Sequence, residues 1–104
     1  MSKTFEEEVL KTLRANGSDV TKAHEFEFYV NVPERRNAVL VADKIKESGY
    51  NTELSRSGRH WLVVAKKSFV PVKGHLADQA RFFGELAAAV HGDFDGWEAK
   101  IVDL

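Results

Sequence analysis

The segment at 24–32, HEFEFYVNV, alternates apolar and polar side chains over its whole length. A period of two is typical of a β-strand with one face in a core and the other face towards solvent. His24, Phe26 and Phe28 belong to the face that we expect to be buried, and Tyr29 belongs to the other face. This segment therefore predicts a β-sheet with one face packed against other elements of the protein.

Three other segments carry apolar residues at the spacing of an amphipathic helix, namely 3–16, 34–48 and 75–91. Ser2 or Thr4 is suited to cap the first of these helices, whose first turn is rich in glutamate. Pro33 suits the start of the second helix. Gly49 and Gly92 suit the ends of the second and third helices, so the sequence predicts three helices with defined ends.

Two further segments, 51–57 and 60–67, predict a β-hairpin that turns around Ser57 and Gly58. With a loop of two residues, Leu54 opposes Trp61 on one face, and Leu62 lies on the other. A final strand is expected where Trp97, Ala99 and Ile101 alternate with charged residues. Trp97 should then face the core and pack under the last helix.

The predicted order is an N-terminal helix followed by βαββαβ, in a single domain over 1–104 with its core at about 24–102. Because crossover connections are right-handed, this order predicts an α+β, ferredoxin-like sandwich with a four-stranded antiparallel sheet. Both crossover helices lie on one face of that sheet. Strands one and three are central neighbours.

The second face of this sheet would carry Tyr29, Leu62 and Val64, which together are too apolar to remain fully in water. Either the N-terminal helix covers them with its stripe of Val9 and Leu13, or a partner protein does. We favour the helix, because its apolar stripe otherwise has nothing to pack against.

Catalytic, metal and cofactor sites have no recognisable pattern in the sequence. There are no cysteines, and the four histidines, at 24, 60, 75 and 91, lack the spacing of a metal site. Asp93 and Asp95 have the chemistry to hold a cation or to act as acid and base. Beside Gly96, they are more typical of side-chain hydrogen bonds in a turn. We therefore expect no catalytic residue, no metal and no cofactor.

Nucleic-acid and membrane functions also lack support in the sequence. The net charge is −1, and no apolar run is long enough for a membrane span or a leader, so we expect a cytoplasmic protein. Arg56 and Arg59 at the hairpin tip are separated from Lys66 and Lys67 by roughly 20 Å of strand. The sequence thus predicts no direct nucleic-acid partner, no membrane partner, and a monomer in preference to an oligomer.

Three short motifs occur in a fixed order: NGSD at 16–19, SGY at 48–50 and FDGW at 94–97. With these motifs, the chain resembles the RraB family of protein inhibitors of ribonuclease E over about 5–102. The resemblance implies a non-enzymatic bacterial protein that binds ribonuclease E and inhibits it. Some members of the family carry a long acidic C-terminal tail, whereas this sequence ends at Leu104. Without such a tail, only a few local carboxylates would attract a basic partner.

Two surfaces are candidates for that contact. The acidic end would steer a basic, arginine-rich partner, and the second sheet face would anchor it. An alternative is a ferredoxin-like interaction or ligand-sensing module with an unrelated target. The candidate residues are Asp93, Asp95 and Glu98 at the acidic end, and Tyr29, Leu62 and Val64 on the sheet face.

Overall fold

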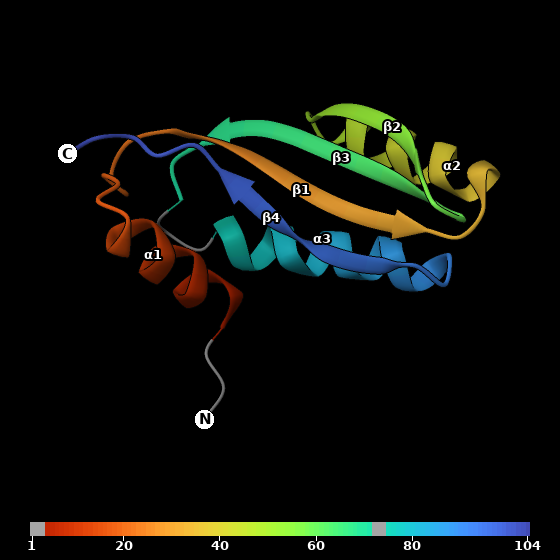
Figure 1. Cartoon of the computed structure of the whole chain (residues 1–104), viewed down its shortest axis with the longest axis horizontal. Helices are drawn as coiled ribbons and strands as arrows, with labels where there is room; N and C mark the ends of the chain where they lie inside the picture. The colour runs from red at the N-terminus through yellow and green to blue at the C-terminus, as the bar shows by residue number, and fades with distance from the viewer. Residues whose placement is uncertain (1–3, 72–74) are drawn as a thin grey trace.

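The structure, a computed structural model, describes residues 4–71 and 75–104. Within these residues the chain forms three helices and a four-stranded antiparallel open sheet (Figure 1). The elements are α1 (Phe5–Ala15), β1 (His24–Val32), α2 (Arg35–Glu47), β2 (Asn51–Ser57), β3 (His60–Phe69), α3 (His75–Ala89) and β4 (Asp93–Ala99). The predicted α+β class and the number of strands are confirmed.

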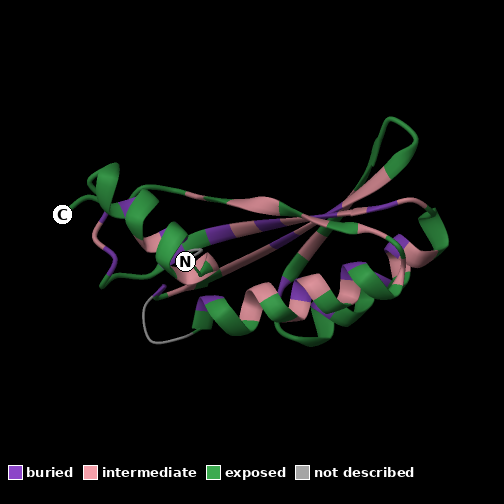
Figure 2. Cartoon of the chain, turned by 90° about the horizontal axis from the view of Figure 1, so that it is seen from below, coloured by how far each residue is buried: buried purple, intermediate pink, exposed green. Residues whose placement is uncertain are grey.

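The strands follow the order β2-β3-β1-β4, and every neighbouring pair is antiparallel. β1 and β3 are therefore the central neighbours, as the sequence predicted. α2 and α3 lie on one side of the sheet, which Figure 2 shows nearly edge-on. The order of elements differs from a strict ferredoxin-like fold because α1 precedes β1.

The core lies between the sheet and these two helices. Phe26 and Phe28 of β1 are fully buried, and the Phe28 ring lies 4.9 Å from the ring of Phe83 in α3. Figure 2 shows the buried residues along the strands and on the helix sides that face them. The predicted burial of one face of β1 is confirmed, because its alternate residues from His24 to Val32 are all buried.

Thr4 caps α1, since its side-chain oxygen accepts a hydrogen bond from the Glu7 backbone N–H at 3.1 Å. Ser2, the other predicted cap, lies outside the described residues. Val9 and Leu13 are buried, but they join the same core as Phe26. The expectation that α1 covers the second sheet face is therefore wrong.

α1 instead packs against α3 and extends the helical side of the molecule. Its Phe5 ring lies 5.6 Å from the ring of Phe94, a β4 residue on the core face. This arrangement buries the stripe of α1 without the second sheet face, so Tyr29, Leu62 and Val64 remain only half-buried.

The register of the hairpin differs from the predicted one by two residues. Leu54 pairs with Val63, and Trp61 pairs with Arg56. The two-residue loop is Gly58 and Arg59, because Gly58 adopts a positive φ of 60° that favours glycine at the first loop position. An even shift leaves each side chain on its predicted face.

The final strand also begins earlier than predicted. β4 starts at Asp93, so the acidic run belongs to the strand itself, and Ile101 lies beyond its end and is exposed. The pairing with β1 shifts between Tyr29 and Val30, which indicates a bulge where β4 has one extra residue. A bulge re-aims a strand locally, and simple alternation in the sequence does not reveal it.

Candidate functional site

The face of the sheet opposite α2 and α3 is here called the open face. The alternation of β1 and the pairing of the four strands place polar and apolar side chains on it together. Its principal residues are Glu25, Glu27, Tyr29 and Asn31 of β1, Glu53 and Ser55 of β2, Leu62, Val64 and Lys66 of β3, and Asp93 and Glu98 of β4.

The apolar centre of the open face lies on the two middle strands. Tyr29 is directly opposite Val64, and Leu62 is opposite Asn31. All four are half-buried, and the Asn31 side-chain oxygen is buried without a hydrogen-bond partner among the described residues. The half-exposed Tyr29, Leu62 and Val64 side chains form an apolar patch here, which suits contact with another molecule.

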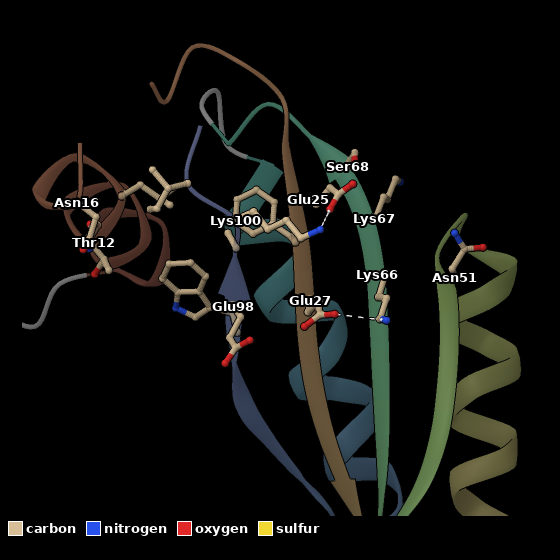
Figure 3. A pocket seen from close by; sticks show the side chains of 15 residues that line it. Thr12, Asn16, Glu25, Glu27, Asn51, Lys66, Lys67, Ser68, Glu98 and Lys100 are labelled. Atoms are coloured by element: carbon tan, nitrogen blue, oxygen red, sulfur yellow. Dashed lines mark hydrogen bonds and ion pairs between the residues drawn. The ribbon is translucent and has the colours of Figure 1, made fainter. Parts of the chain in front are cut away.

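Beside this patch, two carboxylates oppose each other across the strands. Glu27 of β1 pairs in register with Glu98 of β4, and like charges in that position destabilise a sheet. Glu27 is compensated, because the Tyr29 hydroxyl donates to its Oε2 at 2.8 Å and Lys66 Nζ lies 3.4 Å from its Oε1. Among the described residues Glu98 has no ion pair, and Figure 3 shows it beside Glu27 without a dashed line to any neighbour.

The protonation of these groups follows from their contacts. Burial raises the pKa of Tyr29, and the carboxylates of Glu27 and Glu98 raise it further, so the hydroxyl remains a neutral donor. The hydrogen bond to Glu53, with Nζ 3.0 Å from Oε1, raises the pKa of Lys66. Glu27 thus has both a hydroxyl donor and a cation, whereas Glu98 lacks a cation in the part of the chain that the structure describes.

A groove of about 870 Å³ lies at the end of the sheet next to α1 (Figure 3). Glu25 and Lys100 form an ion pair at 2.9 Å along it. The Trp97 ring lines the groove together with Thr12 and Asn16 of α1. Lys100 lowers the pKa of Glu25, chiefly by its hydrogen bond, so this pair is already satisfied.

Trp97 faces the core, as the sequence predicted, but it is less buried than a core anchor. It shares the core face with its pairing partner Phe28, and its ring is 6.1 Å from that of Phe26. However, the residue is only half-buried, because part of its ring lines a groove with residues of α1. The position of α1, which the sequence did not predict, accounts for the difference.

Asp93 and Asp95 are exposed, and their side chains make no hydrogen bond among the described residues. The predicted turn hydrogen bonds are absent because the two residues are in β4. Asp93 pairs in register with Asn31, and this places it on the same face as Glu98 and Tyr29. The structure thus joins most of the two separately predicted surfaces into one. Asp95 lies at the bulge.

Sequence reasoning missed one buried polar cluster. Ser18 Oγ lies 2.6 Å from His24 Nε2 and accepts a hydrogen bond from the Val102 N–H at 2.9 Å. Both side chains are at least 97% buried, so this hydroxyl–imidazole pair has no access to a substrate. It holds the C-terminal segment against the start of β1. The NGSD motif at 16–19 was its only signal in the sequence.

Within 4–71 and 75–104, no group of three or more histidine, aspartate or glutamate side chains is arranged to hold a metal ion. No helix in the described part of the chain is long and apolar enough to cross a membrane. The open face and its groove therefore stand out as the site with the most distinctive chemistry.

Comparison with known proteins agrees with the motifs. The family model described as RraB, regulator of ribonuclease activity B, matches residues 3–99, which is nearly the whole chain. A search of curated proteins found no match. Since the family model covers far more than half of the sequence, the chain belongs to the RraB family of regulators of ribonuclease activity.

Proposed function

We propose that this protein is a non-enzymatic regulator that binds ribonuclease E, or a related RNA-degrading assembly, and inhibits it in the bacterial cytoplasm. Membership of a regulator family supports this proposal. The proposal includes a ferredoxin-like core, supported by the strand order β2-β3-β1-β4.

The observation that carries the proposal is Glu98, which lies next to the apolar patch of the open face and has no ion pair within residues 4–71 and 75–104. A lysine or arginine of the partner placed beside Glu98 would relieve its repulsion with Glu27. Tyr29, Leu62 and Val64 would supply the desolvated contact area. Carboxylates then steer the association, and the apolar residues slow dissociation.

Inhibition would follow from occupation of the partner's basic segments. Segments rich in arginine bind RNA mainly through phosphate contacts, so a protein that covers them lowers the affinity for RNA. This chain makes and breaks no covalent bond in such a mechanism. The degree of inhibition should depend on salt, because the competing contacts are both electrostatic.

The test is association of the purified chain with immobilised ribonuclease E over a series of salt concentrations. The double variant Asp93→Lys/Glu98→Lys should associate more slowly and with a flatter salt dependence. The matched control is Asp43→Lys/Glu47→Lys, which makes the same charge change on exposed positions of α2. Equal association of both variants at all salt concentrations would refute the proposal.

The second candidate is an interaction or ligand-sensing module with an unrelated target, which the groove beside Trp97 favours. A pull-down from a bacterial cell extract separates the two candidates. Recovery of ribonuclease E, lost in the Asp93→Lys/Glu98→Lys variant, supports regulation of the ribonuclease. Specific recovery of a different protein in its place supports the second candidate.

A further inference from the structure

The start of α2 and the end of the β2–β3 hairpin meet at one tryptophan. The guanidinium carbon of Arg35, the first residue of α2, lies 5.6 Å from the centre of the Trp61 ring. The guanidinium carbon of Arg56 lies 5.9 Å from the same centre. Contacts of this kind attract a cation to an aromatic face and hold its otherwise flexible side chain. Both cations thus have defined positions.

Two more arginines belong to the same end of the molecule, which we call the basic end: Arg36 follows Arg35 in α2, and Arg59 lies in the hairpin loop. All four arginines are exposed, and none forms an ion pair with a carboxylate of the described residues. Glu34 is the acidic residue adjacent in sequence. The whole chain has a net charge of −1, so the residues outside this positive end are together negatively charged.

The N-terminus of α2 makes the basic end more positive. Glu34 is the N-cap residue, but its side chain makes no capping hydrogen bond, and the first turn contains no acidic residue. Arginines at this position oppose the helix dipole, whose positive end is the N-terminus. The local sequence therefore sacrifices helix stability, and a bound anion would compensate for both the dipole and the uncapped N–H groups.

We propose that the basic end binds the phosphodiester backbone of single-stranded RNA. Guanidinium groups bind phosphate oxygens through paired hydrogen bonds, and the cation–π contacts with Trp61 restrict two of them in advance. The two guanidinium carbons are at most the sum of their distances to the ring centre apart, about 11.5 Å. Both guanidinium groups are therefore close enough together to contact phosphates of one RNA strand.

RNA fits these positions better than an acidic peptide does. A nucleic-acid strand carries a negative charge on every nucleotide. The arginines of α2 and of the hairpin can therefore contact phosphates in several alignments of the strand. Nucleobases also stack on guanidinium planes and on the faces of aromatic rings, and an acidic peptide has no such bases. The sequence alone predicted no direct nucleic-acid partner, because the hairpin arginines are far from the lysines at the other end of the strand. Folding brings Arg35 of α2 to the hairpin arginines, which that prediction did not consider.

The experiment is fluorescence anisotropy with the purified full chain and a labelled 12-nucleotide single-stranded RNA, without any ribonuclease. We expect a dissociation constant of roughly 10⁻⁴ to 10⁻⁶ M at about 0.05–0.15 M salt. The logarithm of the association constant should fall with the logarithm of salt with a slope of about −3, since each of four contacts contributes about −0.7.

The test variant is Arg35→Gln/Arg56→Gln, and the matched control is Lys44→Gln/Lys46→Gln at exposed positions in the last turns of α2. The test variant should bind RNA at least about tenfold more weakly, with a slope reduced by about 1.4. The control should remain within about twofold of the wild type. Thermal unfolding and circular dichroism establish that both variants are folded.

Three results would overturn the proposal: no binding at about 10⁻³ M protein in low salt, equal weakening by both variants, or displacement of the RNA by polyglutamate of equal charge at lower concentration. The last result would assign the basic end to an acidic protein. Because no ribonuclease is present, the result is independent of whether the open face binds ribonuclease E.

Discussion

Replacement of Glu98 by glutamine separates the stability of the fold from its proposed function. Glu98 and Glu27 face each other across β4 and β1, where opposing Cβ atoms are about 5 Å apart. In water, two charges at that distance repel by about 0.8 kcal/mol, and salt reduces this value. Lys66 already compensates Glu27 in part.

The expected gain in the free energy of unfolding for Glu98→Gln is therefore about 0.2–0.5 kcal/mol. For a domain of this size the melting temperature should rise by about 1–4 °C. The same substitution should weaken association with ribonuclease E by about 10- to 100-fold, because it removes one charge-assisted contact of about 1.5–3 kcal/mol. These two results together would show that Glu98 lowers the stability of the fold and strengthens binding to the partner.

The assays are thermal unfolding and binding to immobilised ribonuclease E, with Glu47→Gln as the control. Glu47 is exposed at the end of α2, away from the open face, so its variant should bind like the wild type. The reasoning fails if Glu98→Gln lowers the melting temperature by several degrees. It fails equally if this variant binds as tightly as the control.

Three further predictions concern the fold and its ionisation. Gly92→Ala should destabilise strongly, because the added Cβ overlaps the Asn31 carbonyl oxygen, whereas Gly84→Ala in α3 meets nothing and should stabilise by about 0.5–1 kcal/mol in urea unfolding. Ser18→Ala should cost about 2–4 kcal/mol in the same assay, since it leaves a buried imidazole nitrogen and a backbone N–H without partners. Burial raises the pKa of both Tyr29 and Tyr50, so absorbance at 295 nm should show no tyrosinate below about pH 11 until the protein unfolds. In the unfolded chain both hydroxyls ionise near the ordinary tyrosine pKa of about 10, so stability should fall as the pH rises above that value. Titration of either tyrosine near its ordinary pKa in the native state would contradict this.

The strands and helices with the clearest periodicity were predicted almost to the residue. The alternation at 24–32 matches β1, and the helical stripe at 34–48 matches α2 with its last buried residue Ile45. These elements follow local rules: burial of alternate residues in a strand, and of one side in a helix. The order of these elements then predicted which strands are neighbours in the sheet, because crossover connections are right-handed.

The features that the sequence did not predict depend on contacts between segments that are distant in the chain. The sequence shows an apolar stripe on α1 but not which surface buries it, and α1 packs on the side of α3 and Phe94. The start of β4 depends on a bulge opposite Tyr29, and bulges leave no alternation to detect. The meeting of Arg35 and Arg56 at Trp61 joins an α-helix to a hairpin, which no local pattern encodes.

The most direct test of the central claim is the initial rate at which purified ribonuclease E cleaves a labelled RNA while the concentration of this protein is increased. The wild type should lower the rate to a plateau. Leu62→Glu, which adds a charge to the apolar patch, should require at least about tenfold more protein. Arg35→Gln/Arg56→Gln should still inhibit, because those residues lie outside the open face. An unchanged cleavage rate at saturating wild-type protein, or equal inhibition by Leu62→Glu, would contradict the account.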